Sequence, residues 1–190
     1  MEITLLNNLL KKPNGEWLIQ KISDAFDSKN KDVESFLKQK AIQSAKLSTS
    51  STYLVRSMEH GADLLGYFTL ALKTLTVKCS DLSATQQKTL RRFGSFDEES
   101  QSYKLPAILL AQFGRNFSKN SASISGKELM DSALECIKTV FSLSSGKTVF
   151  LECEPKEKLI QFYQNCGFSL LDNEICAKDK KQLIQLFRFV

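Results

Sequence analysis

The sequence predicts an α/β fold, in the wide sense that includes α+β: a strongly twisted, mixed β-sheet flanked by helices in a single domain. Strand-like and helical patterns alternate along most of the chain. One strand, Leu105–Phe113, is almost wholly apolar, and a long amphipathic helix that Gly126 opens comes after it. A length of 190 residues suits one domain with a proper core and is short for two.

The first fifty residues predict a turn, the start of a strand and one helix. Residues 13–15 read Pro-Asn-Gly, which is typical of a turn, and Trp17–Ile19 has the composition of the start of a strand. Asp32 is expected to cap a helix whose apolar residues recur at helical spacing. These residues are Val33, Phe36, Leu37, Ala41 and Ala45.

An antiparallel hairpin is expected next. Ser51–Glu59 and Leu64–Lys78 are rich in Thr, Val, Tyr and Phe, and the turn between them contains His60. The polar stretch Ser80–Gln101 predicts a variable connection with helical turns around Thr85–Phe93.

The second half of the chain predicts alternating strands and helices. We treat residues 1–190 as one domain with a core of about 17–168 and a C-terminal strand at 183–190. The expected elements are a buried strand at Lys104–Phe113, the helix from Gly126 to about Leu143, a strand at Thr148–Cys153, a helix from about Lys156 to Asn165 that Gly167 stops, and a final strand at Leu183–Val190.

Composition excludes several kinds of chemistry. The single histidine, His60, lies in a probable turn, so a multi-histidine metal site is not expected and we predict no metal. The five cysteines form no C-x-x-C pair, which indicates reduced thiols and a cytoplasmic protein. No apolar run approaches the roughly 18 residues of a membrane span. The formal net charge of +5 fits a polyanionic partner and fits a solvated surface equally well.

The start of the long helix has two interpretations. A strand, a polar loop and a glycine-opened helix present several backbone N–H groups together, which is a geometry that binds phosphates. Ser125 and Glu128 also fit a capping box, the sign of an ordinary helix start. Both interpretations stay open at this point.

Residues 159–168 read LIQFYQNCGF, and this segment is similar to a segment of a known protein family. An apolar helix that ends in F-Y-x-x-x-G-F, after a short strand, resembles the GNAT N-acetyltransferase superfamily. The similarity extends over roughly Trp17 to Phe168. The segments DVESFLKQKAIQ, TYLV, LGYFTLA and LAQF are similar to the acetyltransferase toxins of toxin–antitoxin pairs, which acetylate aminoacyl-tRNA.

The resemblance implies acetyl-CoA as cosubstrate and a set of site residues. Tyr163 is the expected general acid to the CoA thiolate, because a phenol is still protonated at neutral pH. Glu152 lies on the corresponding strand, but no general base is identified. The residues expected to bind the cofactor are Phe113, Gly114, Arg115, Ser123, Ser125, Gly126, Lys127 and Glu128. The phosphate loop departs from the family pattern Q/R-x-x-G-x-G/A, since residues 121–126 read SASISG.

The predicted function is transfer of an acetyl group from acetyl-CoA to a primary amine. Charged tRNA is the suggested acceptor, and the lysine-rich N-terminal quarter would suit phosphates. An antitoxin protein and a second copy of the chain are the suggested protein partners, and no membrane is expected. Three alternatives stay open: a small-molecule or protein amine acetyltransferase, a non-catalytic module with a degenerate phosphate loop, and a nucleic-acid binder without chemistry.

Overall fold

The computed structural model describes residues 1–58, 63–118, 124–176 and 182–190. The expected turn at His60 lies outside these residues. In chain order the elements are β1 (Glu2–Leu5), α1 (Leu6–Leu10), α2 (Gly15–Asp24), α3 (Lys31–Ser35), the π-helical turn η1 (Phe36–Lys40), α4 (Ala41–Lys46), β2 (Ser51–Arg56), β3 (Leu64–Lys78), the 3₁₀ turn η2 (Cys79–Asp81), α5 (Ala84–Leu90), β4 (Ser95–Asp97), β5 (Ser102–Arg115), α6 (Gly126–Ser144), β6 (Thr148–Cys153), α7 (Glu157–Asn165), β7 (Ser169–Cys176) and β8 (Gln182–Phe189).

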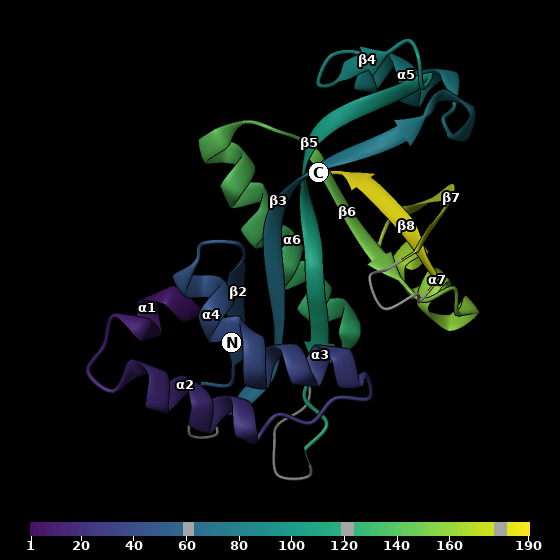
Figure 1. Cartoon of the computed structure of the whole chain (residues 1–190). Helices are drawn as coiled ribbons and strands as arrows, with labels where there is room; N and C mark the ends of the chain where they lie inside the picture. The colour runs from purple at the N-terminus through teal and green to yellow at the C-terminus, as the bar shows by residue number, and fades with distance from the viewer. Residues whose placement is uncertain (59–62, 119–123, 177–181) are drawn as a thin grey trace. The chain divides into compact units, whose positions relative to one another are not determined.

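The strands form the mixed sheet that the sequence predicts (Figure 1). Hydrogen-bonded neighbours follow the order β1-β2-β3-β5-β6-β8-β7, and β4 pairs with β5. Strands β5 and β6 are parallel, with Ile108 opposite Val149. The pairs β1–β2, β2–β3, β4–β5, β6–β8 and β7–β8 are antiparallel. By its contacts the chain divides into two compact units, residues 1–71 with 111–133, and residues 72–110 with 134–190.

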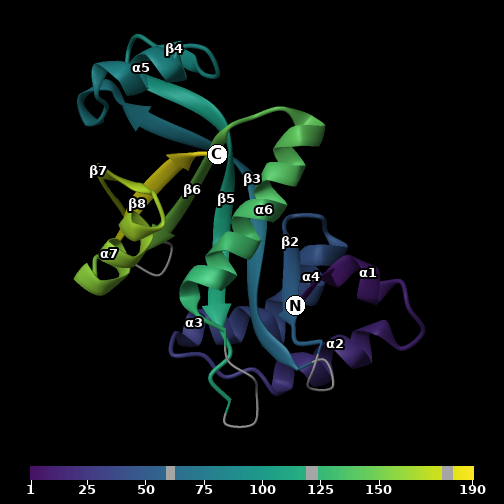
Figure 2. The same cartoon turned by 180° about the vertical axis from the view of Figure 1, so that it is seen from behind.

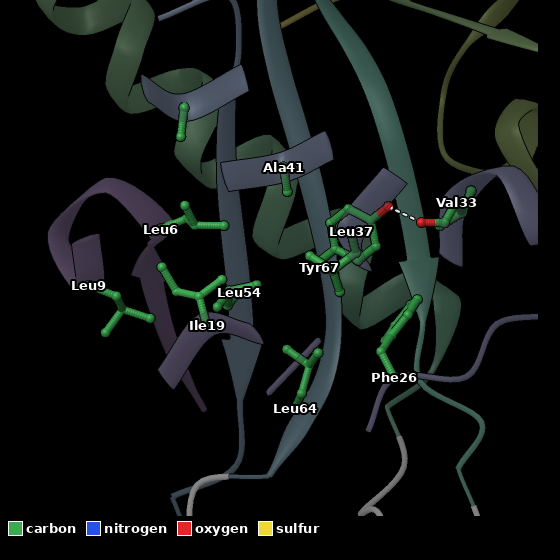
Figure 3. Close-up of a cluster of buried hydrophobic side chains, with 11 residues drawn as sticks. Leu6, Leu9, Ile19, Phe26, Val33, Leu37, Ala41, Leu54, Leu64 and Tyr67 are labelled. Atoms are coloured by element: carbon green, nitrogen blue, oxygen red, sulfur yellow. Dashed lines mark hydrogen bonds between the residues drawn. The ribbon is translucent and has the colours of Figure 1, made fainter. Parts of the chain in front are cut away.

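The first unit has a hydrophobic core between its N-terminal helices and strands β2 and β3. The helical spacing predicted from Val33 to Ala45 is confirmed, because Val33, Leu37, Ala41 and Ala45 are all buried. Figure 3 shows these helices and strands directing their side chains at one cluster. That cluster comprises Leu6, Leu9, Ile19, Phe26, Val33, Leu37, Ala41, Ala45, Leu54, Leu64 and Tyr67.

Tyr67 ties strand β3 to helix α3 inside this core. Its side chain is fully buried, its ring meets that of Phe26 edge-on at 5.2 Å, and its hydroxyl donates a hydrogen bond to the backbone carbonyl of Val33 (Figure 3). Burial raises the pKa of the Tyr67 phenol, so the group stays neutral. The π-helical turn η1 directly follows helix α3, and the N–H of Ala41 donates a hydrogen bond to the carbonyl of Phe36 at its end.

In the second unit, strand β8 lies between β6 and β7 (Figure 2). Leu186 of β8 is fully buried and stands opposite Leu151 on one side and Leu170 on the other. A second cluster fills this unit and contains Leu75, Val77, Leu82, Leu90, Tyr103, Leu105, Ala107, Phe150, Leu171 and Phe187. The helical turns expected in the polar connection are present as α5, which Ser83 and Gln86 cap reciprocally.

Some expectations for single elements were wrong. Trp17–Ile19 lies in helix α2, not in a strand, because Ile19 and Ser23 are buried at a spacing of four residues. The cap of the next helix is Asn30, whose side chain accepts from the N–H of Asp32, so Asp32 lies in the first turn. Strands β1 and β7 and helix α1 were not predicted at all.

Candidate active-site residues

The capping box predicted at the start of helix α6 is present in the first unit. The N–H of Ser125 donates to the Glu128 carboxylate at 2.9 Å, and the N–H of Glu128 donates to the Ser125 hydroxyl at 3.1 Å. Hydrogen bonding to the Glu128 carboxylate by Ser125, through its side chain most and then through its backbone N–H, lowers the pKa of Glu128. Two of the amides that could meet a phosphate therefore already have partners, while those of Gly126 and Lys127 lie outside the capping box.

The charges around this helix start are mixed. Lys127 forms an ion pair with Asp131 one turn along the helix, at 3.0 Å, and both side chains are largely exposed. An exposed pair of this kind is weak, so a phosphate could draw the ammonium group away from Asp131. The carboxylate of Glu128 opposes an anion unless it stays in the capping box.

The end of strand β5 places Gly114 and Arg115 in well-defined surroundings. Arg115 donates through Nη1 to the carbonyl of Ile124 at 2.9 Å, and its guanidinium lies 4.8 Å from the centre of the Phe117 ring. Arg115 therefore anchors the residue that leads into helix α6. A Cβ atom on Gly114 would lie 2.6 Å from Cγ1 of Val33, so the strand packs too closely against α3 for any side chain there.

Tyr163 lies near the C-terminal end of helix α7 in the second unit and is buried, with 9% of its surface exposed. The rings of Phe162 and Phe168 meet it edge-on at 5.1 and 6.1 Å. Burial raises the pKa of its phenol, and the neighbouring Cys153 and Cys166 add to the rise. The group is therefore protonated throughout the physiological range, as a general acid requires.

The chain after Tyr163 forms the helix stop that the sequence predicts. Gly167 adopts a positive φ of 83°, its N–H donates to Gln164 at 2.8 Å, and the N–H of Phe168 donates back to Tyr163 at 3.1 Å. This is a Schellman motif with its usual apolar contact, here between the rings of Phe168 and Tyr163. The Gly-Phe pair of the sequence pattern thus has a structural role at the end of this helix.

The structure brings together part of the predicted site. Within the first unit Arg115 contacts Ile124, which directly precedes Ser125, while Phe113 lies on the same strand as Arg115. Ser123 lies outside the residues described. Glu152, the carboxylate considered as a base, accepts a hydrogen bond from Gln185 at 3.0 Å on an exposed face.

Sequence reasoning missed two polar residues that hold these segments. Asn116 is buried and bonds the carbonyl of Leu64 at 2.8 Å and the N–H of Asp27 at 3.0 Å. Arg188 donates to the carbonyl of Cys166, directly after helix α7. The sequence signal available for Arg188 was a lone arginine in the largely apolar run 183–190.

The described residues also bear on metal binding and on membrane insertion. No group of three or more His, Cys, Asp or Glu side chains that could hold a metal ion occurs among them. Of the helices in the described ranges, none has the length and apolar character needed to cross a membrane.

Comparisons with known proteins identify the fold. No family model matches the chain, and the search of curated proteins gives no match. The chain is similar to AtaT in complex with acetyl-methionyl-tRNAfMet, with a TM-score of 0.64 and 16% identity over 96% of this chain and 92% of that one. It is also similar to a tyrosine-to-phenylalanine variant of KacT, with a TM-score of 0.64 and 20% identity over 100% of this chain and 95% of that one.

A third similar structure is AtaTR bound with acetyl-CoA, with a TM-score of 0.57 and 16% identity over 99% of this chain and 93% of that one. The expected fold class is therefore confirmed. The chain has the GNAT fold, which it shares with AtaT and KacT.

Proposed function

We propose that this protein is an acetyl-CoA-dependent N-acetyltransferase that moves an acetyl group to a primary amine, working as one domain over residues 1–190. The observation that carries the proposal is the buried, protonated phenol of Tyr163, fixed at a helix end in a chain with the GNAT fold. Burial raises the pKa of the phenol, so it keeps its proton at neutral pH as a general acid must; the same shift makes it a weaker acid, so proton transfer requires the thiolate to form directly beside the hydroxyl.

The cofactor site in this proposal lies at the end of β5 and the start of α6. Phe113, Gly114 and Arg115 would line the pantetheine arm, and the residues opening the helix would bind the pyrophosphate. Within that group, the amides of Gly126 and Lys127 are the strongest candidates, because the capping box occupies those of Ser125 and Glu128. Ser123 completes the proposed set.

The proposed reaction is direct transfer. The nitrogen of a neutral amine attacks the thioester carbon, the carbon–sulfur bond breaks, and the phenol of Tyr163 gives its proton to the departing thiolate. The acceptor nitrogen loses one proton to solvent, and Tyr163 regains one. A thiolate leaves the tetrahedral carbon far more readily than an amide anion would, so a single acid at the sulfur suffices.

Charged tRNA is the acceptor we propose, with an antitoxin protein and a second copy of the chain as partners. The supporting observation is the similarity to AtaT complexed with acetyl-methionyl-tRNAfMet. A second candidate function is a non-catalytic GNAT-fold module. The capping box favours it, since that box removes two amides from phosphate binding.

One experiment separates these functions. The protein is incubated with labelled acetyl-CoA and, in parallel, with methionyl-tRNA, spermidine or a lysine-containing peptide, and the labelled product is identified. Label on the methionyl group supports the proposed acceptor, and label on spermidine or peptide assigns a small-molecule or protein amine. Calorimetry with CoA that shows no binding at about millimolar ligand supports the non-catalytic module.

The role of Tyr163 is tested with a matched pair of tyrosine variants. Tyr163→Phe removes only the hydroxyl and is expected to lower kcat about 10²- to 10⁴-fold. Tyr103→Phe removes a hydroxyl that accepts from Arg91 at 3.0 Å and that the proposed site does not include, and it is expected to leave kcat unchanged. A Tyr163→Phe protein as fast as the wild type would disprove the general-acid role.

A further inference from the structure

Arg188 stands out in strand β8 of the second unit, because it is the one charged residue in the run Leu183–Val190. It lies opposite Val149 of β6, and its flanking residues are Phe187 and Phe189. Its side chain is half-buried. A cation in such a place needs a structural or functional reason, because its desolvation is costly.

The guanidinium of Arg188 contacts three consecutive residues at the end of helix α7. Nη1 donates a hydrogen bond to the carbonyl of Cys166, the residue directly after the helix. The guanidinium carbon lies 5.9 Å from the centre of the Phe168 ring. A Cβ atom on Gly167 would lie 3.3 Å from Nη1, so the glycine allows this close approach.

This placement is electrostatically favourable. The C-terminal end of a helix carries partial negative charge on carbonyl groups that have no partner inside the helix. Among the side chains that the structure describes, which leave out 172–181, no carboxylate pairs with Arg188 and its Nε has no hydrogen-bond partner. The hydrogen bond to the Cys166 carbonyl ties the side chain to the helix end.

The same helix end carries Tyr163. The N–H of Phe168 donates to the carbonyl of Tyr163 at 3.1 Å, and the two rings meet edge-on at 6.1 Å. Arg188 thus holds one face of Phe168 while Tyr163 packs against the same residue. Loss of the guanidinium would loosen the turn at 166–168 and release the ring that orients the phenol.

We propose that Arg188 is a positioning residue for Tyr163: it clamps the turn that closes helix α7 and so fixes the direction of the phenol. This inference rests on the proposed function, in which Tyr163 supplies a proton to the thiolate. A small displacement of an acid from its reacting atom costs rate steeply, since productive geometry is narrow.

The first test compares Arg188→Met with Arg188→Lys, using release of CoA with methionyl-tRNA as acceptor. Arg188→Met is expected to lower kcat roughly ten- to a hundredfold while KM for acetyl-CoA changes less than about twofold. Arg188→Lys keeps a donor for the Cys166 carbonyl and is expected to recover part of the loss. Arg92→Met, an exposed arginine in the same unit, is the matched control with unchanged kcat.

The second test is a double-mutant cycle with Tyr163→Phe. If Arg188 acts through the phenol, adding Arg188→Met to Tyr163→Phe is expected to change kcat by less than about twofold. An effect on kcat that is independent of the phenol would instead multiply the two losses. Multiplied losses, or an Arg188→Met protein with wild-type kcat beside a slow Tyr163→Phe protein, would refute the positioning role while leaving the proposed function in place.

Hydrogen exchange gives a readout that does not depend on the acceptor. In Arg188→Met the amide of Phe168 is expected to exchange at least about tenfold faster, while the amides of helix α6 keep their protection. Unchanged protection at Phe168 overturns the clamp. If Tyr163→Phe is as active as the wild type, the general-acid role of Tyr163 fails, the catalytic part of the inference falls with it, and exchange alone decides whether Arg188 holds this turn.

Discussion

The close approach of strand β5 to helix α3 gives a prediction whose size follows from the structure. In Gly114→Ala the new Cβ would lie 2.6 Å from Cγ1 of Val33, about 1 Å inside the usual separation of two carbon atoms. Val33 is buried and belongs to the core cluster, so it has little room to move. Overpacking of this kind costs about 1–3 kcal/mol, which corresponds to a fall in Tm of roughly 2–10 °C for a chain of this size.

A double mutant makes this prediction specific to the named contact. Val33→Ala alone removes the clashing methyl groups and is expected to cost about 1.5–2.5 kcal/mol in lost burial and cavity formation. In Val33→Ala with Gly114→Ala, the added methyl group meets space instead of Cγ1. The double mutant is therefore expected to be about as stable as Val33→Ala, with a coupling energy of about 1–3 kcal/mol.

The assay is urea unfolding of the ligand-free protein followed by circular dichroism, with each free energy of unfolding obtained by linear extrapolation. Gly146→Ala is the control partner for Val33→Ala, because the atoms nearest to its new Cβ would all belong to Phe141. That pair is expected to be additive within about 0.5 kcal/mol. If the losses in free energy of unfolding for Val33→Ala and Gly114→Ala also add, the contact with Val33 is not what excludes a side chain at Gly114.

Three further predictions concern the hydrogen bond from Tyr67 to Val33, the capping box of helix α6 and the pH dependence of stability. Tyr67→Phe leaves the Val33 carbonyl without its hydroxyl donor, so we expect a loss of about 1–3 kcal/mol in urea unfolding, and an unchanged midpoint would contradict this. Ser125→Ala removes the hydroxyl that caps the Glu128 amide and should cost about 1 kcal/mol; equal stability of the variant would argue against the capping box. Burial raises the pKa of Tyr67 and Tyr163, so the unfolded chain releases these protons first as pH rises above about 10. The stability that these groups contribute is fully present below about pH 10 and declines above it, and a flat urea midpoint between about pH 9 and 11 would exclude this linkage.

Residues close in sequence determined what could be predicted without a structure. The burial of Val33, Leu37, Ala41 and Ala45 follows from helical spacing. The capping box of α6 joins residues three apart, and the stop at Gly167 needs only a position with positive φ. Short-range geometry of this kind depends on residues a few positions apart, so the sequence alone predicts it.

Local signals also misled where they were weak or balanced. Trp17–Ile19 has side chains that suit a strand, but packing of Ile19 against the core selects a helix. Asn30 and Asp32 are both good caps, and the position of Val33 in the core decides between them in favour of Asn30. Burial outweighs propensities of a few tenths of a kcal/mol per residue.

The sequence alone determined the class of fold and the strand and helix that border the proposed cofactor site, and its resemblance to a family led to the proposal of Tyr163 as the acid. Only the tertiary structure decided what surrounds Tyr163 and what holds it. The bond from Arg188 to Cys166 spans 22 residues, and that from Tyr67 to Val33 spans 34. No local pattern specifies such pairs, because they exist only when strands and helices from distant parts of the chain pack together and bury the polar groups at their ends.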